Sequence, residues 1–291
     1  MTIPRIFDRR LYAWRRSRAR ESFLAGDVGD NLAERLGAVN RHFASGLDLS
    51  SRNQTFSAIS PFAKNWTRTS LVPGTGALVA DEEALPFAPH SFDLAISALS
   101  LHAVNDLPGV LAQIRHVLKP DGLFLAAMFG GATLAELRMS FGVGESDILG
   151  GISPRIAPFA DVRELGGLLQ RAGFALPVVD SEKTIVRYRS FTTLRDDLRA
   201  LGETNALAER ARSFLRRDVL AAALAAYDAQ FRDGDGHLVA TFDVVYLTAW
   251  TPHESQPQPL RPGSAKTRLA DALGTSEHSA GERAHPERKD A

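Results

Sequence analysis

The stretch that most constrains the fold is residues 92–129, FDLAISALSLHAVNDLPGVLAQIRHVLKPDGLFLAAMF. Its two short apolar runs, FDLAISAL and LFLAAMF, have the length and composition of buried strands. Between them, apolar residues recur at three- and four-residue spacing, which predicts one apolar face of a helix: Val110, Leu111, Ile114, Val117 and Leu118. Two strands joined so closely by a helix predict a right-handed βαβ unit, and therefore a parallel α/β sheet.

The ends of this helix are marked in the sequence. Asn105-Asp106 predicts its N-cap, and Pro108 falls in its first turn, where proline is tolerated. Lys119-Pro120-Asp121-Gly122 predicts a turn before the second strand.

Other segments fit the same fold class. Further strands are predicted at 43–50, 65–71, 77–87, 177–191 and 237–250. Further helices are predicted at 30–39, 133–141 (with a Thr133…Glu136 capping box), 161–174, 192–201 and 206–231. The Gly- and Pro-rich residues 142–160 predict a loop over the carboxyl end of the sheet.

Composition excludes several classes of function. The formal net charge of the 291 residues is +0, so nothing global indicates nucleic acid or an anionic membrane as a partner. No apolar run reaches the roughly 20 residues of a membrane-spanning helix. The chain has no cysteine, which excludes disulfides, thiolate metal sites and cysteine nucleophiles and fits a cytoplasmic protein. The histidines are scattered, so we predict no metal site.

Residues 1–24 form a dense basic segment with two interpretations. It resembles the Arg-rich presequence of a mitochondrial protein, but Asp8 and Glu21 interrupt it. We therefore favour a basic helix that covers the sheet or a substrate entrance and docks through Ile6, Leu11 and Trp14. The predicted division is a helical cap at 1–35, an α/β domain at 36–251 and a disordered tail at 252–291, where Pro, Ser, Gly and charged residues dominate.

Polar side chains follow three predicted strands: Asp48, the group Asp81-Glu82-Glu83, and Ser97, Ser100 and His102. In a doubly wound sheet a ligand binds outside the carboxyl ends of the strands. Carboxylates accept hydrogen bonds from ribose hydroxyls or pair with an ammonium group, so the pattern suits a nucleoside with an amino-acid tail. The same acids could instead cap helices, and His102 is either an acid/base group or a structural residue.

Binding of a dinucleotide or ATP is not predicted. Clustered carboxylates repel a diphosphate, and the chain contains neither GxGxxG nor GxxxxGK[ST].

These segments also carry a family resemblance. LDLS, then DEEALPFAPHSFDLAISALSLHAVNDLP, then LKPDGLFLAAMFGG resemble, in order, the motifs of class I S-adenosylmethionine-dependent methyltransferases. More narrowly, FDRR, SLHAVNDLPGVLAQIRHVLKPDG, AMFGGATLAELRMSF and AWTPHESQPQPLRPGSA resemble the complex I assembly factor 5 group and its bacterial relatives. The malonyl-carrier-protein methyltransferases of the biotin pathway are more distantly similar.

The resemblance implies a doubly wound, Rossmann-like methyltransferase sheet of seven strands with the last one antiparallel. It also implies a helical N-terminal cap and a helical insertion before the last strand. S-adenosylmethionine is the implied cofactor. The resemblance assigns Asp48 and Ser50 to its methionine end, Asp81 and Glu82 to its adenine, and Ser97, Ala98 and His102 to the region of methyl transfer.

The chain departs from the family pattern at two places. The family has a glycine-rich turn, DLGxGxG, where this chain has Ser50-Ser51-Arg52-Asn53-Gln54, whose side chains would crowd the usual methionine position. It also has an acid after the second strand that holds the ribose, whereas this chain reads TRTSLVPGTG. The cofactor motif is therefore degenerate.

Three functions follow from this resemblance and its departures. The first is an S-adenosylmethionine-dependent methyltransferase, with His102 as the candidate catalytic residue. The second is an assembly factor that acts on a subunit of respiratory complex I, by arginine hydroxylation or as a chaperone. The third is a non-catalytic binding scaffold. The predicted location is the cytoplasm, with the mitochondrial matrix as the alternative.

Overall fold

The computed structural model describes residues 5–50, 52–73, 77–257 and 267–276 and divides the chain into two units, Met1–His253 and Glu254–Ala291. The second unit contains the short helix α9 (Leu269–Leu273). Much of the predicted disordered tail, 258–266 and 277–291, lies outside the described residues. The tail and the boundary after residue 35 therefore stay predictions.

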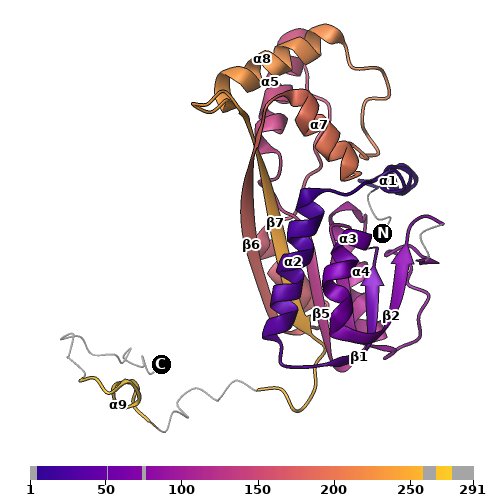
Figure 1. Ribbon diagram of the computed structural model, residues 1–291, viewed down its shortest axis with the longest axis vertical. Helices are drawn as coiled ribbons and strands as arrows, with labels where there is room; N and C mark the ends of the chain where they lie inside the picture. The colour runs from indigo at the N-terminus through magenta and orange to yellow at the C-terminus, as the bar shows by residue number, and fades with distance from the viewer. Residues whose placement is uncertain (1–4, 51, 74–76, 258–266, 277–291) are drawn as a thin grey trace, which may run out of the picture. The chain divides into compact units, whose positions relative to one another are not determined.

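The first unit is built on one seven-stranded sheet with the order β3-β2-β1-β4-β5-β7-β6 (Figure 1). Its strands are β1 (Phe43–Leu49), β2 (Ala63–Ser70), β3 (Leu78–Val79), β4 (Phe92–Ala98), β5 (Leu118–Phe129), β6 (Ala175–Tyr188) and β7 (Leu238–Trp250). β1 to β5 pair in parallel, and β7 is antiparallel to both of its neighbours. The predicted doubly wound sheet with an antiparallel last strand is confirmed.

Helices occupy both faces of the sheet and the region beyond its carboxyl edge. They are α1 (Arg9–Arg16), α2 (Phe23–Ala38), α3 (Asn53–Ile59), α4 (Leu107–Val117), α5 (Ala135–Leu149), α6 (Val162–Arg171), α7 (Phe191–Ala200) and α8 (Arg217–Phe231), with short 3-10 turns at Ser60–Phe62 and Leu101–Ala103. None of the helices in the described part of the chain is long and apolar enough to cross a membrane.

The central strands are buried on both faces, as parallel strands in α/β proteins are. In β4, Leu94 and Ile96 pack in the apolar cluster that contains α2 and α3. Ala95, between them, points to the other face and packs in the cluster that contains α4 and α6. The predicted cap of α4 is confirmed, because Asp106 accepts a hydrogen bond from the Gly109 backbone N–H at 2.9 Å.

Beyond the carboxyl ends of the parallel strands, α5, α7 and α8 form a helical layer, and α1 lies beside it (Figure 1). α7 and α8 lie between β6 and β7 in the chain, which confirms the predicted insertion before the last strand. The helix predicted at 206–231 begins only at Arg217. The residues before it hold the N-terminal segment instead: Leu207 forms an antiparallel bridge with Phe7, and Ala208 donates to the Ile6 carbonyl at 2.8 Å.

The predicted anchors of the N-terminal segment were mostly wrong. Ile6 is 42% exposed and Trp14 is 51% exposed, whereas Phe7 and Tyr12 are buried. Tyr12 lies one helical turn from Arg9 and Arg16, so the face of α1 that meets the domain is aromatic and basic rather than aliphatic.

The prediction around residues 133–160 was also wrong in part. Thr133 and Glu136 do not form a capping box, because both bond to β7: Thr133 Oγ1 donates to the Asp243 carbonyl at 2.9 Å, and Glu136 accepts from the Thr241 backbone N–H at 3.1 Å. The predicted loop from 142 starts later, since α5 continues to Leu149. Gly144 of α5 allows close packing, because a Cβ there would lie 2.6 Å from the Ala223 backbone nitrogen of α8.

The turn predicted at 119–122 lies within β5. Leu118 already pairs with Phe92, and the register shifts before Leu94 pairs with Leu123. The extra residues form an irregularity of the strand in which Asp121 has a φ of 59°.

Candidate functional site

The carboxyl ends of β1 and β4 bring predicted site residues together. The two strands are parallel neighbours in which Asp48 pairs with Ile96 and Leu49 pairs with Ser97. Ser50 follows β1 directly, and His102 lies in the 3-10 turn after β4. This edge is therefore the candidate site, as the fold class predicts.

Asp48 is fully buried and is neutralised by an arginine. Arg68, directly opposite in β2, donates from Nε to Asp48 at 3.0 Å. The Arg68 guanidinium also lies over the Phe56 ring, 3.9 Å from its centroid. A cation thus stands near the end of β2, where the family resemblance led us to look for an acid.

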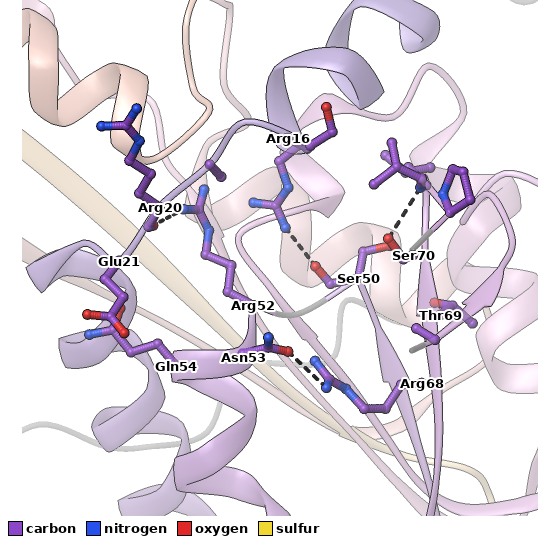
Figure 2. A pocket seen from close by; sticks show the side chains of 16 residues that line it. Arg16, Arg20, Glu21, Ser50, Arg52, Asn53, Gln54, Arg68, Thr69 and Ser70 are labelled. Carbon is purple, nitrogen blue, oxygen red and sulfur yellow. Dashed lines mark hydrogen bonds between the residues drawn. The ribbon is translucent and has the colours of Figure 1, made fainter. Parts of the chain in front are cut away.

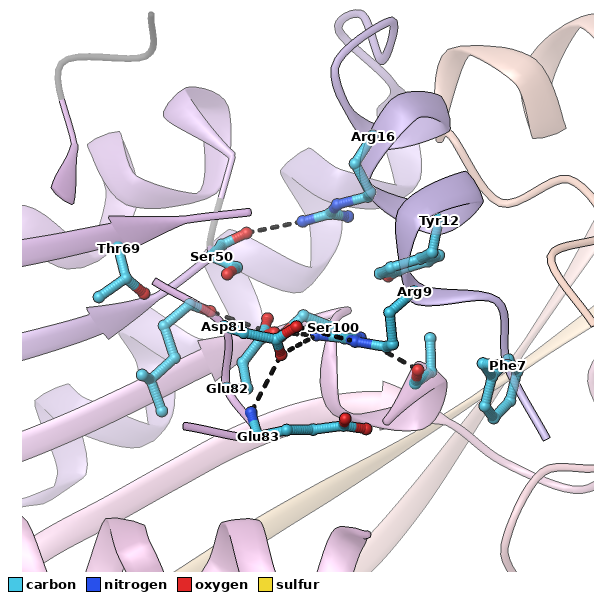
Figure 3. Close-up of polar contacts among 12 residues, drawn as sticks. Phe7, Arg9, Tyr12, Arg16, Ser50, Thr69, Asp81, Glu82, Glu83 and Ser100 are labelled. Atoms are coloured by element: carbon cyan, nitrogen blue, oxygen red, sulfur yellow. Dashed lines mark hydrogen bonds and ion pairs between the residues drawn. The ribbon is translucent and has the colours of Figure 1, made fainter. Parts of the chain in front are cut away.

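Asp81 and Glu82 are also paired with an arginine, which comes from α1. Arg9 Nη2 lies 2.6 Å from Asp81 and forms an ion pair with Glu82, and Arg9 Nη1 donates to the Ala103 carbonyl at 3.0 Å (Figure 3). Burial opposes the charge of Arg9, but Glu82 and Asp81 outweigh it and raise its pKa. These two acids therefore bind α1 to the sheet.

Ser50 stands where the family has the first glycine of its turn. Its φ is 59°, in the left-handed region that glycine adopts without strain. Its carbonyl accepts a hydrogen bond from Arg16 Nη2 at 2.6 Å, so a second arginine of α1 reaches this loop (Figure 3). Ser50 therefore adopts a backbone conformation that favours glycine, although it carries a side chain.

A cavity of about 480 Å³ opens beside this loop. We call it the arginine pocket, because Arg16, Arg20, Arg52 and Arg68 line it (Figure 2). Its wall also contains Ser50, the apolar side chains of Leu71 and Val72, and one acid among the described lining residues, Glu21. The side chains after Asp48 therefore do not fill the region; they leave it open and make it basic.

A second cavity of about 220 Å³ lies beyond β4 and β5. We call it the aromatic cavity, since its wall includes Tyr12, Phe129, Phe141 and Phe159 together with His102 and Glu203. The His102 ring centroid is 4.8 Å from that of Phe129 and 5.6 Å from that of Phe159.

His102 and Glu203 form the polar centre of this cavity. His102 Nε2 lies 3.0 Å from Glu203 Oε2, and Tyr12 donates to Glu203 Oε1 at 3.2 Å. Burial alone would raise the pKa of Glu203, but His102, Arg16 and Arg52 hold it below its usual value. Glu203 is thus an ionised carboxylate, 11% exposed, in the wall of a cavity that is lined by aromatic rings.

The predicted site residues are divided between these features. Ser50 lines the arginine pocket and His102 lines the aromatic cavity, but the other five line neither: Asp48, Asp81, Glu82, Ser97 and Ala98. Ser97 is buried beneath the edge, with its hydroxyl 2.9 Å from that of Ser100. A role for these residues in cofactor binding stays a prediction.

Sequence reasoning missed Arg16 in the arginine pocket, Tyr12 and Glu203 in the aromatic cavity, and Arg9, which pairs with Asp81 and Glu82. The basic run before Arg20 was a signal for the arginines. Glu203 gave none, because 101 positions separate it from His102. In the described part of the chain, no group of three or more histidines and acids is arranged to hold a metal ion.

These side chains do not fit S-adenosylmethionine as the family pattern holds it. The cofactor carries a sulfonium and an ammonium group, which acids stabilise and arginines repel, and a single carboxylate, which brings one negative charge against the four guanidinium groups that line the pocket. Here Asp48 is paired with Arg68, Asp81 and Glu82 are paired with Arg9, and the open pocket presents guanidinium groups.

Comparisons with known proteins agree with the fold. A family model described as a methyltransferase domain matches residues 33–126. The human protein "Arginine-hydroxylase NDUFAF5, mitochondrial" is 41% identical over 257 residues, which cover 84% of this chain and 74% of that protein. The malonyl-[acyl-carrier protein] O-methyltransferase of Xylella fastidiosa is 37% identical over 187 residues, covering 64% and 59%.

Among solved structures, the YcgJ protein of Bacillus subtilis superposes with a TM-score of 0.52 at 13% identity, covering 76% of this chain and 98% of that one. This likeness concerns the fold alone. The identity to the human protein extends over most of both chains. The chain therefore belongs to the class I S-adenosylmethionine-dependent methyltransferase family, close to the arginine-hydroxylase NDUFAF5 proteins.

Proposed function

We propose that this chain hydroxylates an arginine side chain of a protein partner, as a step in the assembly of respiratory complex I. Molecular oxygen and a two-electron reductant from solution would be the co-reactants: one oxygen atom replaces a C–H bond by C–OH, and the other leaves as water. The observation that carries the proposal is the aromatic cavity with the Glu203 carboxylate in its wall. Aromatic faces attract a guanidinium group, and a carboxylate pairs with it through two parallel hydrogen bonds. The name of the relatives, arginine-hydroxylase, supports the same substrate chemistry.

Within this cavity Glu203 would receive the guanidinium, and the rings of Phe129 and Phe159 would flank it. His102, held by Glu203, is our candidate for moving a proton during the reaction. The proposed modification does not depend on S-adenosylmethionine, since the side chains at the position of that cofactor do not favour it.

The proposal also concerns location. The curated relatives are named as mitochondrial proteins, which supports our alternative of the mitochondrial matrix and not the predicted cytoplasm. We propose that the chain works wherever its host assembles complex I, with one of the complex's subunits as its partner.

Mass spectrometry of complex I subunits tests this function. The gene would be deleted in its host and replaced by the wild-type chain, by Glu203→Gln or by Arg163→Gln, a control whose side chain is exposed on α6. We expect one arginine to carry an extra oxygen atom with the wild-type and control chains, and to lose it in the deletion and with Glu203→Gln. An arginine that keeps its oxygen without the gene would contradict the proposal. If the subunit carries an added methyl group in the wild type and lacks it in the deletion strain, the chain transfers a methyl group instead of an oxygen atom.

A further inference from the structure

The four arginines of the arginine pocket carry more positive charge than the single carboxylate of S-adenosylmethionine would pair with. Two of its arginines have acidic partners: Arg68 pairs with Asp48, and Arg16 Nη1 lies 3.6 Å from Glu203. The acids at the strand ends are thus already neutralised. From the sequence we expected these acids to repel a phosphate group. Because each acid is paired with an arginine, it does not repel a phosphate in this pocket.

Arg52 is the side chain most in need of a partner. Its Nη1 donates only to backbone carbonyls, those of Arg20 at 3.4 Å and Ala200 at 3.1 Å. Its Nε and Nη2 are shielded from solvent and have no hydrogen-bond partner among the described residues. A buried donor without an acceptor is costly, and two on one guanidinium form a fork that matches a phosphate or carboxylate.

The surroundings of Arg52 also favour the binding of an anion next to it. Burial, followed by the neighbouring Arg16, lowers the pKa of Arg52 to about 9, which means that the folded chain disfavours its charge. An anion in the pocket would restore it. The Ser50 hydroxyl is also buried without a partner at the same wall, and it can donate to an oxygen of the ligand.

The rest of the pocket indicates more than an inorganic ion. Leu71 and Val72 line one side, and the cavity of about 480 Å³ is within the usual range for small-molecule sites. Figure 2 shows Arg16 reaching toward Ser50 and Arg52 reaching the backbone of Arg20. A ligand with a negatively charged end and a less polar body would meet both kinds of wall.

We propose that the arginine pocket binds an organic phosphate, with its phosphate groups against Arg52, Arg20 and Ser50 and its organic part against Leu71 and Val72. The position that the methyltransferase family gives to a cationic cofactor is thus used for an anionic ligand. This inference is independent of the proposed arginine modification, because it concerns a different cavity.

Isothermal titration calorimetry on the full chain tests this site, with ADP and S-adenosylmethionine as the two probes. We expect ADP to bind more tightly than S-adenosylmethionine, and its affinity to fall with added salt. Arg52→Gln should raise the dissociation constant for ADP about tenfold to hundredfold, the usual effect of losing one charge-assisted pair. Arg163→Gln removes the same charge far from the pocket and should leave the constant unchanged.

Arg20→Gln is the second variant. Its side chain is exposed at the rim, so its removal does not endanger folding if Arg52→Gln proves unstable. It should weaken ADP binding in the same direction. The proposal is overturned if ADP does not bind, if S-adenosylmethionine binds more tightly, or if the pocket variants bind ADP as the wild type does. These outcomes leave the mass-spectrometric test of arginine modification untouched.

Discussion

At the scale of single residues, the site is governed by how buried charges are paired. Asp48, Glu82 and Glu203 are acids at the carboxyl edge of the sheet, and each has an arginine or histidine within hydrogen-bonding distance. A buried ion pair contributes little net stability, but removing one partner leaves an uncompensated charge. The pairs therefore fix the arrangement of the site more than they strengthen the fold.

Glu203 gives a prediction about pH. Its pKa in the folded chain is below the ordinary value of 4.5, so its ionised form contributes stability that is present above about pH 4.5. This contribution is lost as the pH falls through the folded-state pKa. We expect Glu203→Gln to lower the free energy of unfolding by about 3 kcal/mol at neutral pH, because His102 and Arg16 lose their carboxylate.

Urea unfolding across the acid range measures this effect. The difference in unfolding free energy between the wild type and Glu203→Gln should be largest at neutral pH and should shrink below pH 4.5. A difference that is independent of pH would show that Glu203 acts through packing and not through its charge.

At the scale of elements, α1 is attached to the sheet through charge. Arg9 joins it to Asp81 and Glu82, and Arg16 joins it to the Ser50 carbonyl. These contacts link a helix near the start of the chain to loops that follow β1 and β3.

A double-mutant cycle tests the attachment of α1. Arg9→Gln should destabilise the chain by about 3 kcal/mol, since Glu82 is buried and would lose its partner. In the Arg9→Gln variant, the further substitution Glu82→Gln should recover part of the lost stability. The two substitutions should therefore show a coupling energy above about 1 kcal/mol. The exposed pair of Arg232 and Asp228 in the same chain serves as the control and should show much weaker coupling. Strictly additive effects at Arg9 and Glu82 would contradict the contact.

The helical layer makes a second prediction at this scale, through two glycines of α5. Gly144→Ala places a methyl group 2.6 Å from the Ala223 backbone nitrogen, so we expect a loss of about 1–3 kcal/mol. A Cβ on Gly142 meets only the Ile152 side chain, at 3.9 Å. Gly142→Ala should therefore stabilise the helix by up to about 1 kcal/mol. Thermal unfolding of both variants measures the contrast; equal shifts would mean that α5 and α8 do not meet at Gly144.

At the scale of the whole molecule, local patterns predicted the fold well. The apolar runs at 92–129 are β4 and β5, and the three- and four-residue spacing between them is α4. These patterns involve residues that are close in sequence, so the sequence alone reveals them. The extent of α5 was missed because glycines at 142 and 144 disfavour a helix, and only the close approach of α8 explains the glycine at 144.

The site was less predictable for a related reason. Asp48 and His102 are at strand ends, which sequence can locate. The register of β1 and β2 places Arg68 beside Asp48. The helical insertion far along the chain places Glu203 beside His102. Whether an acid faces a ligand or an arginine depends on these long-range contacts, and the sequence pattern is the same in both cases.

The chain has the methyltransferase fold, and we propose that an anion binds at its cofactor position. A crystal structure grown with equal concentrations of ADP and S-adenosylmethionine tests it most directly. The account predicts phosphate oxygens within hydrogen-bonding distance of Arg52 Nε and Nη2, with Asp48 still paired to Arg68. S-adenosylmethionine in the pocket, with Asp48 released from Arg68 to hold it, would contradict the account.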